Sequence, residues 1–162
     1  SNHTVVEITN DEALKAIKDV IWATETFDIT TIRASTGQYL ISKYISENTN
    51  YKVVLSGDGS DEVTSGYIYN YLAPSASELH NEAVKRVKEI HLYDGLRADR
   101  ATSFHGLELR VPFLDTEFVN MYLSIDPELR KPDKNRMEKY LLRLSFDGYL
   151  PEEVLWLSLI HI

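Results

Sequence analysis

The segment "VVLSGDGSDE" at residues 53–62 constrains the fold more than any other part of the chain. It joins a short, nearly unbroken apolar run, "YKVVL", to two serines, two glycines and three carboxylates within seven residues. An apolar run of this length, rich in β-branched residues, predicts a strand that is buried on both faces. Helical patterns before and after it favour a parallel sheet.

The turn that follows this strand has the composition of a ligand-binding loop. In open α/β sheets, ligands gather at the carboxyl ends of the strands. Gly57 and Gly59 permit positive φ and bring backbone N–H groups close to a ligand, and Ser56 adds a hydroxyl. The start of the following helix favours an anion. Together these features predict a phosphate cradle.

Three carboxylates qualify that prediction. Asp58, Asp61 and Glu62 would repel a bare phosphate, but they suit a phosphate that carries Mg2+, because this hard cation prefers oxygen ligands. The loop therefore indicates a metal–nucleotide site. The alternative is a tight strand-to-helix turn whose acidic residues favour the helix N-terminus.

Three other loop motifs do not fit the spacing. A Walker A loop requires lysine after its last glycine, where Ser60 stands. A nucleophile elbow requires a glycine two positions before the serine and another two positions after it, and neither Ser56 nor Ser60 has these glycines. An EF-hand that began at Asp58 would require glycine at its sixth position, where Val63 stands.

The rest of the chain is largely helical. A capping box of Thr9 and Glu12 opens a helix whose apolar stripe we expect in the core, comprising Leu14, Ile17, Val20 and Ile21. Further helices are expected over about 35–48, from a capping box at Ser75 and Glu78 to about residue 93, and in the segments 93–106, 116–125 and 135–146. Residues 107–115, "LELRVPFLD", read as a loop. The predicted class is α/β with a helical C-terminal half, in one domain.

Composition excludes several functions. The net charge of −8 gives no broad basic surface for nucleic acid or an anionic membrane. The chain has no cysteine, which excludes disulfides, thiolate metal sites and cysteine nucleophiles, and its five histidines show no zinc-ligand spacing. Without an apolar run near 18 residues or a signal-like start, a cytoplasmic location is expected.

Four blocks carry a family resemblance. "TFDITTIRAS", "VVLSGDGSDEVTSGYIY", "HGLELRVPFLD" and "LPEEVLW", in this order and spacing, resemble the synthetase domain of glutamine-dependent asparagine synthetases. The resemblance implies an adenine-nucleotide α-hydrolase-like (ATP pyrophosphatase) fold around a parallel sheet. It also implies that ATP and Mg2+ activate aspartate as β-aspartyl-AMP, which ammonia converts to asparagine and AMP after pyrophosphate has left.

The resemblance also assigns roles within the opening segment. It implies that Ser56 and Gly57 contact ATP and that Asp61 holds Mg2+ and pyrophosphate. Asp58 stands where the family usually has a catalytic glutamate that is tied to formation of the adenylate. The shorter side chain changes the reach of this carboxylate by roughly 1.5 Å, a displacement that can cost about a hundredfold in rate.

A second group of implied site residues lies earlier in the chain. Thr30 and Thr31 match the family's loop near phosphate and substrate, and Arg33 matches a catalytic arginine there. A guanidinium, hydroxyls and a metal would stabilise the charge that builds on the non-bridging oxygens at the α-phosphorus. Without the resemblance, a surface arginine near a helix terminus is the simpler interpretation of Arg33.

Two family features are missing from these residues. The chain lacks the Ser-Gly-Gly-x-Asp-Ser pyrophosphatase loop and the N-terminal glutaminase domain that releases ammonia from glutamine. We therefore expect residues 1–156 to be part of a synthetase domain, incomplete at the N-terminus, of a longer parent that forms a homodimer. Residues 157–162, "LSLIHI", are expected to be a non-family tail, with an artefact of the sequence end as one interpretation. A non-catalytic nucleotide-fold module, or an inactive partial copy, is the alternative function.

Overall fold

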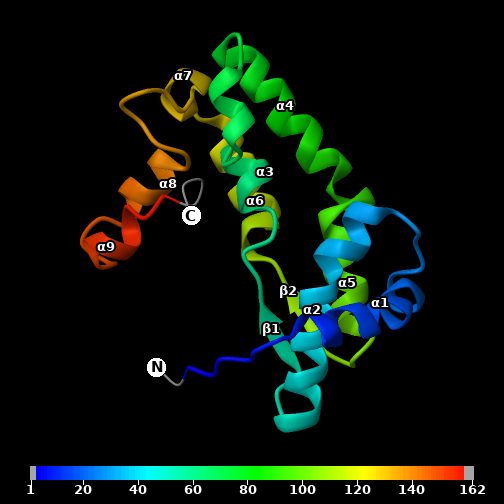
Figure 1. Cartoon of the computed structure of the whole chain (residues 1–162). Coiled ribbons are helices and arrows are strands. Elements are labelled where there is room, and N and C mark those ends of the chain that lie inside the picture. The colour runs from blue at the N-terminus through cyan, green and yellow to red at the C-terminus, as the bar shows by residue number, and fades with distance from the viewer. Residues whose placement is uncertain (1–2, 159–162) are drawn as a thin grey trace. The chain divides into compact units, whose positions relative to one another are not determined.

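The computed structural model describes residues 3–158, and the chain splits into two compact units. Unit 1 contains Ser1–Ser56 and Ile90–Val111, and unit 2 contains Gly57–Glu89 and Pro112–Ile162. Figure 1 colours the chain from its N-terminus to its C-terminus and labels its helices and strands. Within residues 3–158, no helix is both long and apolar enough to cross a membrane.

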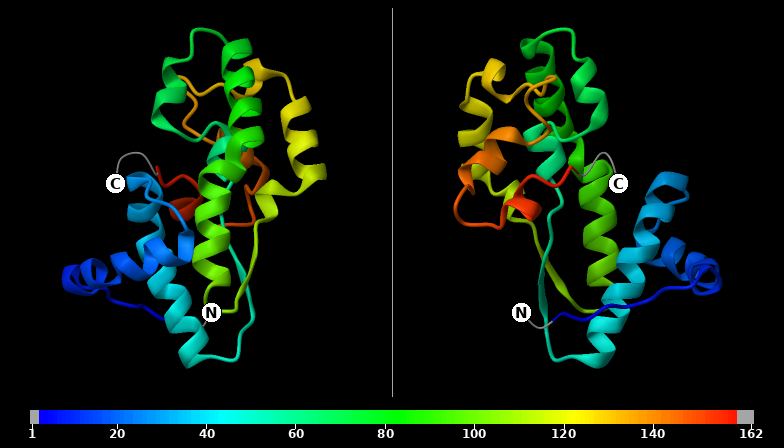
Figure 2. Two further views of the ribbon diagram at one scale, coloured as in Figure 1. Left: turned by 90° about the vertical axis from the view of Figure 1, so that its right-hand side faces the viewer. Right: turned by 60° about the vertical axis from the view of Figure 1, so that its left-hand side comes forward.

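Unit 1 combines α-helices and a short 3-10 helix with a small sheet. Its elements are α1 (Asn10–Thr24), α2 (Ile29–Asn48), β1 (Val53–Leu55), the 3-10 helix η2 (Ile90–Leu92), α5 (Asp94–Ser103) and β2 (Glu108–Arg110). Figures 1 and 2 show β1 and β2 side by side. The strands are parallel, with Val54 opposite Leu109. The predicted parallel pairing is therefore confirmed, in a mostly helical α/β structure.

Two predictions about these strands are wrong. Residues 107–115 are not simply a loop, because they contain β2 and the 3-10 helix η3 (Pro112–Leu114). Strand β1 is not buried on both faces, since Val53 is 42% exposed and Leu55 is 75% exposed. Apolar composition records a preference for burial, but actual burial depends on which elements pack against the strand.

The core of unit 1 is built largely from small side chains. Its buried cluster comprises Ala16, Val20, Ala23, Tyr39 and Ala101, which come from α1, α2 and α5. Small residues at these contacts allow helices to approach closely. The predicted capping box at Thr9 and Glu12 is present, but the predicted apolar stripe is only partly in the core. Val20 is fully buried, whereas Leu14 is 65% exposed.

Unit 2 is helical. Its elements are α3 (Ser60–Thr64), the 3-10 helix η1 (Ile68–Leu72), α4 (Ala76–Glu89), η3, α6 (Thr116–Ser124), α7 (Pro127–Arg130), α8 (Tyr140–Ser145) and α9 (Glu152–Leu155). At the start of α4, the Ser75 hydroxyl accepts a hydrogen bond from the Glu78 N–H at 3.1 Å, as the first half of a capping box requires. Figure 1 shows α3 beside α6, and α3 also contacts α4 and η3.

A buried ion pair connects three segments of unit 2. Arg143 Nη2 lies 3.0 Å from Glu138 Oε1, with the side chains only 9% and 2% exposed. Arg143 also donates to the backbone carbonyls of Glu138 and Leu155, at 3.0 and 2.6 Å. Tyr71 donates to the other carboxylate oxygen of Glu138 at 3.3 Å. These bonds connect η1, α8 and α9 through one desolvated network.

We predict that Arg143→Met destabilises unit 2 by about 3 kcal/mol, because it leaves the buried Glu138 carboxylate without its cation. Urea denaturation measures the loss, and hydrogen exchange of peptides from residues 138–158 localises it. Arg86→Met is the matched control, since Arg86 pairs with Glu82 at the surface, where the side chains are 42% and 33% exposed. The control is expected to cost less than about 1 kcal/mol. Equal losses in both variants would contradict a central role for the buried pair.

Candidate functional site

The "SGDGSDE" segment leaves the carboxyl end of β1 as a tight turn. The Ser56 N–H extends the strand ladder by donating to the Arg110 carbonyl at 2.9 Å. The Ser60 N–H then donates to the Gly57 carbonyl at 3.2 Å, and α3 begins. The predicted strand–turn–helix arrangement is therefore present.

The two glycines of the turn have different roles. Gly59 has φ of +88°, and a Cβ added to it would lie 2.4 Å from Leu114 Cδ2, so both the backbone conformation and the packing require glycine. Gly57 is not among the positive-φ residues, and a Cβ there would meet nothing within 4 Å. The positive φ that both glycines permit is therefore adopted at Gly59 and not at Gly57. Open space beside its backbone is compatible with close approach of a ligand.

The three carboxylates of the turn lie in different environments. Glu62 is buried and accepts a hydrogen bond from the Tyr67 hydroxyl, so it belongs to the interior of unit 2. Burial and this bond raise the pKa of Tyr67, which therefore acts as a neutral donor. Asp58 is half-buried, and the side chain of Asp61 is 38% exposed. Asp58 and Asp61 are thus the two carboxylates of this turn that solvent reaches.

Lys139 joins this turn from far along the sequence. Its Nζ lies 2.9 Å from Asp61 Oδ1 and 3.0 Å from the Ser60 hydroxyl oxygen. The lysine side chain is only 10% exposed. Lys139 is not predicted from the sequence, because nothing in "NRMEKY" marks one lysine as the partner of a serine 79 positions earlier.

The N-terminus of α3 gives less help to an anion than expected. The helix has only five residues, Ser60–Thr64, so few aligned peptide dipoles face the loop. Anion binding here would depend on loop N–H groups and nearby side chains instead.

The residues of the turn fit a shared magnesium ion better than a dedicated metal cage. Among residues 3–158, no group of three or more His, Cys, Asp or Glu side chains could hold a metal ion. Mg2+ commonly takes only one or two protein carboxylates and completes its shell with substrate phosphates and water. The partly exposed carboxylate of Asp61 suits that mode of binding.

Thr30, Thr31 and Arg33 lie in a helix, which corrects the expected loop. Helix α2 begins at Ile29 rather than near residue 35. It begins there because the Asp28 carboxylate caps it, accepting from the Thr31 N–H at 2.7 Å. Hydrogen bonds from Thr31 hold the pKa of Asp28 below its usual value. Thr31 is buried, and Thr30 and Arg33 are exposed.

Arg33 lies beside an apolar groove of unit 1. The groove runs between α1 and α2 and is lined by Leu14, Ile17, Ile29 and Ile32, among others. The Arg33 side chain is exposed at this groove. This segment belongs to unit 1 and residues 57–62 belong to unit 2, so the structure describes the two groups of predicted site residues separately.

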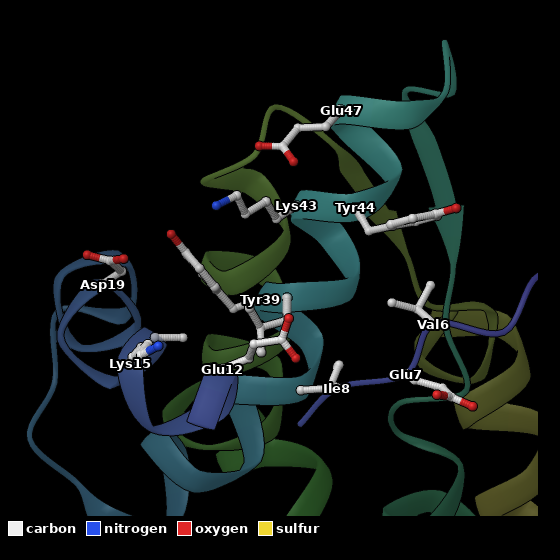
Figure 3. A pocket seen from close by; sticks show the side chains of 12 residues that line it. Val6, Glu7, Ile8, Glu12, Lys15, Asp19, Tyr39, Lys43, Tyr44 and Glu47 are labelled. Carbon is white, nitrogen blue, oxygen red and sulfur yellow. The ribbon is translucent and has the colours of Figure 1, made fainter. Parts of the chain in front are cut away.

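A second groove in unit 1 is lined by mixed charges. Figure 3 shows Lys43, Tyr44 and Glu47 of α2 facing it, together with Lys15 and Asp19 of α1. None of the predicted site residues lines this groove. Its acidic and basic side chains lie close together, as in a solvated helix face.

Comparison with known proteins identifies the family. The family model described as asparagine synthase matches residues 1–81 and 70–158. The chain is 54% identical over 158 residues to "Asparagine synthetase [glutamine-hydrolyzing]" from Gallus gallus, and 52% identical over 158 residues to the proteins of that name from Mus musculus and Homo sapiens. Each match covers 96% of this chain.

These relatives are considerably longer, since the chain spans 28% of the length of each. The matched residues nevertheless include β1, the acidic turn, α2 and Lys139. Because the family model covers every residue that the structure describes, the chain belongs to the asparagine synthase family.

Proposed function

We propose that this chain is the ATP-handling part of a glutamine-dependent asparagine synthetase with an adenine-nucleotide α-hydrolase-like fold. The observation that carries the proposal is the acidic glycine turn at the carboxyl end of a parallel strand, in a chain 52–54% identical to proteins named asparagine synthetase. The parent, meaning the longer protein that we infer contains this chain, would use aspartate, ATP, and ammonia from glutamine. Residues 1–156 would belong to its synthetase domain.

The proposed reaction begins with adenylation. A side-chain carboxylate oxygen of aspartate attacks the α-phosphorus of ATP, the bond to the bridging oxygen breaks, and pyrophosphate leaves. Ammonia then attacks the β-aspartyl carbonyl, loses a proton and displaces AMP, which leaves asparagine. Magnesium supplies positive charge to the phosphate oxygens when it is bound.

The residues of the turn would bind and orient the nucleotide. Ser56 and Gly57 would donate hydrogen bonds to it, because loop N–H groups and a hydroxyl suit phosphate and sugar oxygens. Asp61 would hold the metal–pyrophosphate group, and Asp58 would position the reacting groups. Arg33, with Thr30 and Thr31, would stabilise charge at the α-phosphorus.

The remaining parts of the proposal concern the parent. We infer that an N-terminal glutaminase domain supplies the ammonia, since the relatives are named glutamine-hydrolyzing. We also propose that the parent is cytoplasmic and forms a homodimer. Residues 159–162 of the predicted tail lie outside the described residues, and the boundary at residue 157 stays a prediction.

Product analysis tests the proposed reaction. The parent, incubated with ATP, Mg2+, aspartate and ammonia, should release AMP and asparagine in equal amounts. Formation of ADP would exclude adenylation. A parent that binds ATP but forms neither product would favour the alternative of a non-catalytic nucleotide-fold module.

We predict that Asp61→Asn reduces asparagine formation by the parent by at least about a hundredfold, because the amide keeps the shape but loses the charge that a cation requires. Initial rates of AMP release measure the effect, and circular dichroism checks folding. Asp126→Asn is a control, since Asp126 caps α7 by accepting from the Glu128 N–H at 2.9 Å. It should leave the rate almost unchanged. Full activity of the Asp61→Asn variant would show that the Asp61 carboxylate is not needed for catalysis and that the turn is only a structural connection between β1 and α3.

The length of the side chain at position 58 can be tested by substitution. We expect Asp58→Glu to raise the rate of adenylate formation, by up to about a hundredfold, because the added methylene restores the reach of the family glutamate. Asp58→Ala should nearly abolish it. Aspartate-dependent exchange of labelled pyrophosphate into ATP isolates this step. A lower rate in Asp58→Glu with unchanged ATP affinity would show that the pocket has adapted to aspartate, and equal rates in all variants would exclude a role for residue 58.

A further inference from the structure

The contact between Lys139 and Asp61 has the geometry of a cation held against a metal-binding carboxylate. The ammonium lies 2.9 Å from Asp61 Oδ1 and is almost entirely covered, whereas the Asp61 side chain is 38% exposed. One side of the carboxylate therefore faces the lysine, and the other remains open to solvent. A second cation that approaches the open side of this carboxylate is repelled by the lysine ammonium already held there.

The packing around this pair leaves little freedom. A Cβ added to Gly66 would lie 2.1 Å from Asp61 Oδ1 and 2.5 Å from Lys139 Cε, so only glycine lets the two side chains meet here. The Gly66 N–H also donates to the Asp61 backbone carbonyl at 2.9 Å. The pair is thus enclosed by backbone on one side.

The left-handed backbone conformation of Lys139 is a second observation that points to a function for its side chain. Lys139 has φ of +59° and ψ of +23°, a left-handed conformation that costs a non-glycine residue of order 1 kcal/mol or more. Glycine would adopt it without strain. The neighbouring Glu138 is fixed by the buried pair with Arg143, and this holds the start of α8 in place. A lysine kept in a strained conformation, with a buried stem and its charge on a carboxylate, points to a function for that charge.

We propose that Lys139 is a positioning residue that occupies the place of a divalent cation beside Asp61 and gives up the carboxylate when the metal binds. This inference rests on the proposed role of Asp61 in holding Mg2+. The ammonium keeps the carboxylate oriented and opposes metal binding in the absence of substrate. Two positive charges within a few ångströms repel each other, so Lys139 lowers the affinity of the free protein for the metal alone.

The test uses Mn2+ as a spectroscopic substitute for Mg2+, bound to the parent without nucleotide and followed by electron paramagnetic resonance. We expect Lys139→Met to bind Mn2+ about fivefold more tightly than the unmodified parent, the change that loss of one partly exposed ion pair produces. Lys139→Arg, which keeps the charge, should retain the original affinity. Lys134→Met is the matched control, because this lysine of the same segment is exposed, and it should leave the affinity unchanged.

A double variant tests whether Lys139 acts through Asp61. Asp61→Asn should weaken Mn2+ binding, and adding Lys139→Met to it should cause no gain in affinity. A purely structural role for Lys139 would lower the melting temperature without raising Mn2+ affinity, and this result would overturn the inference. Unchanged Mn2+ binding in Asp61→Asn would exclude both the metal-binding role of Asp61 and the proposed role of Lys139. The proposed synthetase activity is tested separately, by measuring AMP release from the parent.

Discussion

The buried Glu138–Arg143 pair is the interaction on which the arrangement of unit 2 depends. Arg143 satisfies the carboxylate and backbone carbonyl of Glu138 as well as the carbonyl of Leu155, with both side chains almost completely removed from water. Removing two charges from water is costly, and only such complete hydrogen bonding offsets that cost. The result is specific geometry, because a single position of α8 satisfies all these groups at once.

That geometry extends to the acidic turn. Glu138 immediately precedes Lys139, whose left-handed backbone directs an almost buried ammonium onto Asp61 and Ser60. Gly66 permits the close approach, and Gly59 permits the turn to pack against Leu114. Each carboxylate of the turn consequently has a distinct environment. Glu62 is held inside by Tyr67, whereas Asp61 is held at the surface by a lysine.

Unit 1 depends on packing of a different kind. Its buried cluster contains alanines where the helices meet. Several larger apolar side chains of this unit are at least 75% exposed, including Trp22, Phe27 and Leu55. The apolar groove between α1 and α2 lies beside Arg33, and its lining includes Leu14, Ile17 and Ile21, which the sequence pattern predicts for the core. Hydrophobic periodicity identifies the face of a helix that prefers burial, but it does not identify the element that covers that face.

Short-range spacing in the sequence is enough to predict the local features of this protein, whereas contacts between residues far apart in the chain depend on the complete fold. The Thr9–Glu12 capping box and the strand–turn–helix order of residues 53–64 follow from short-range spacing, because the hydrogen bonds that close the cap and begin α3 join residues within four positions of one another. The start of α2 was misjudged because the cap at Asp28 was overlooked, although its signal is also local. The strand β2 was missed because pairing with β1 involves residues more than fifty positions apart. Lys139 cannot be identified as a site residue from the sequence. Its position depends on the neighbouring buried Glu138–Arg143 pair, and its partner, Asp61, comes close to it only when the chain folds.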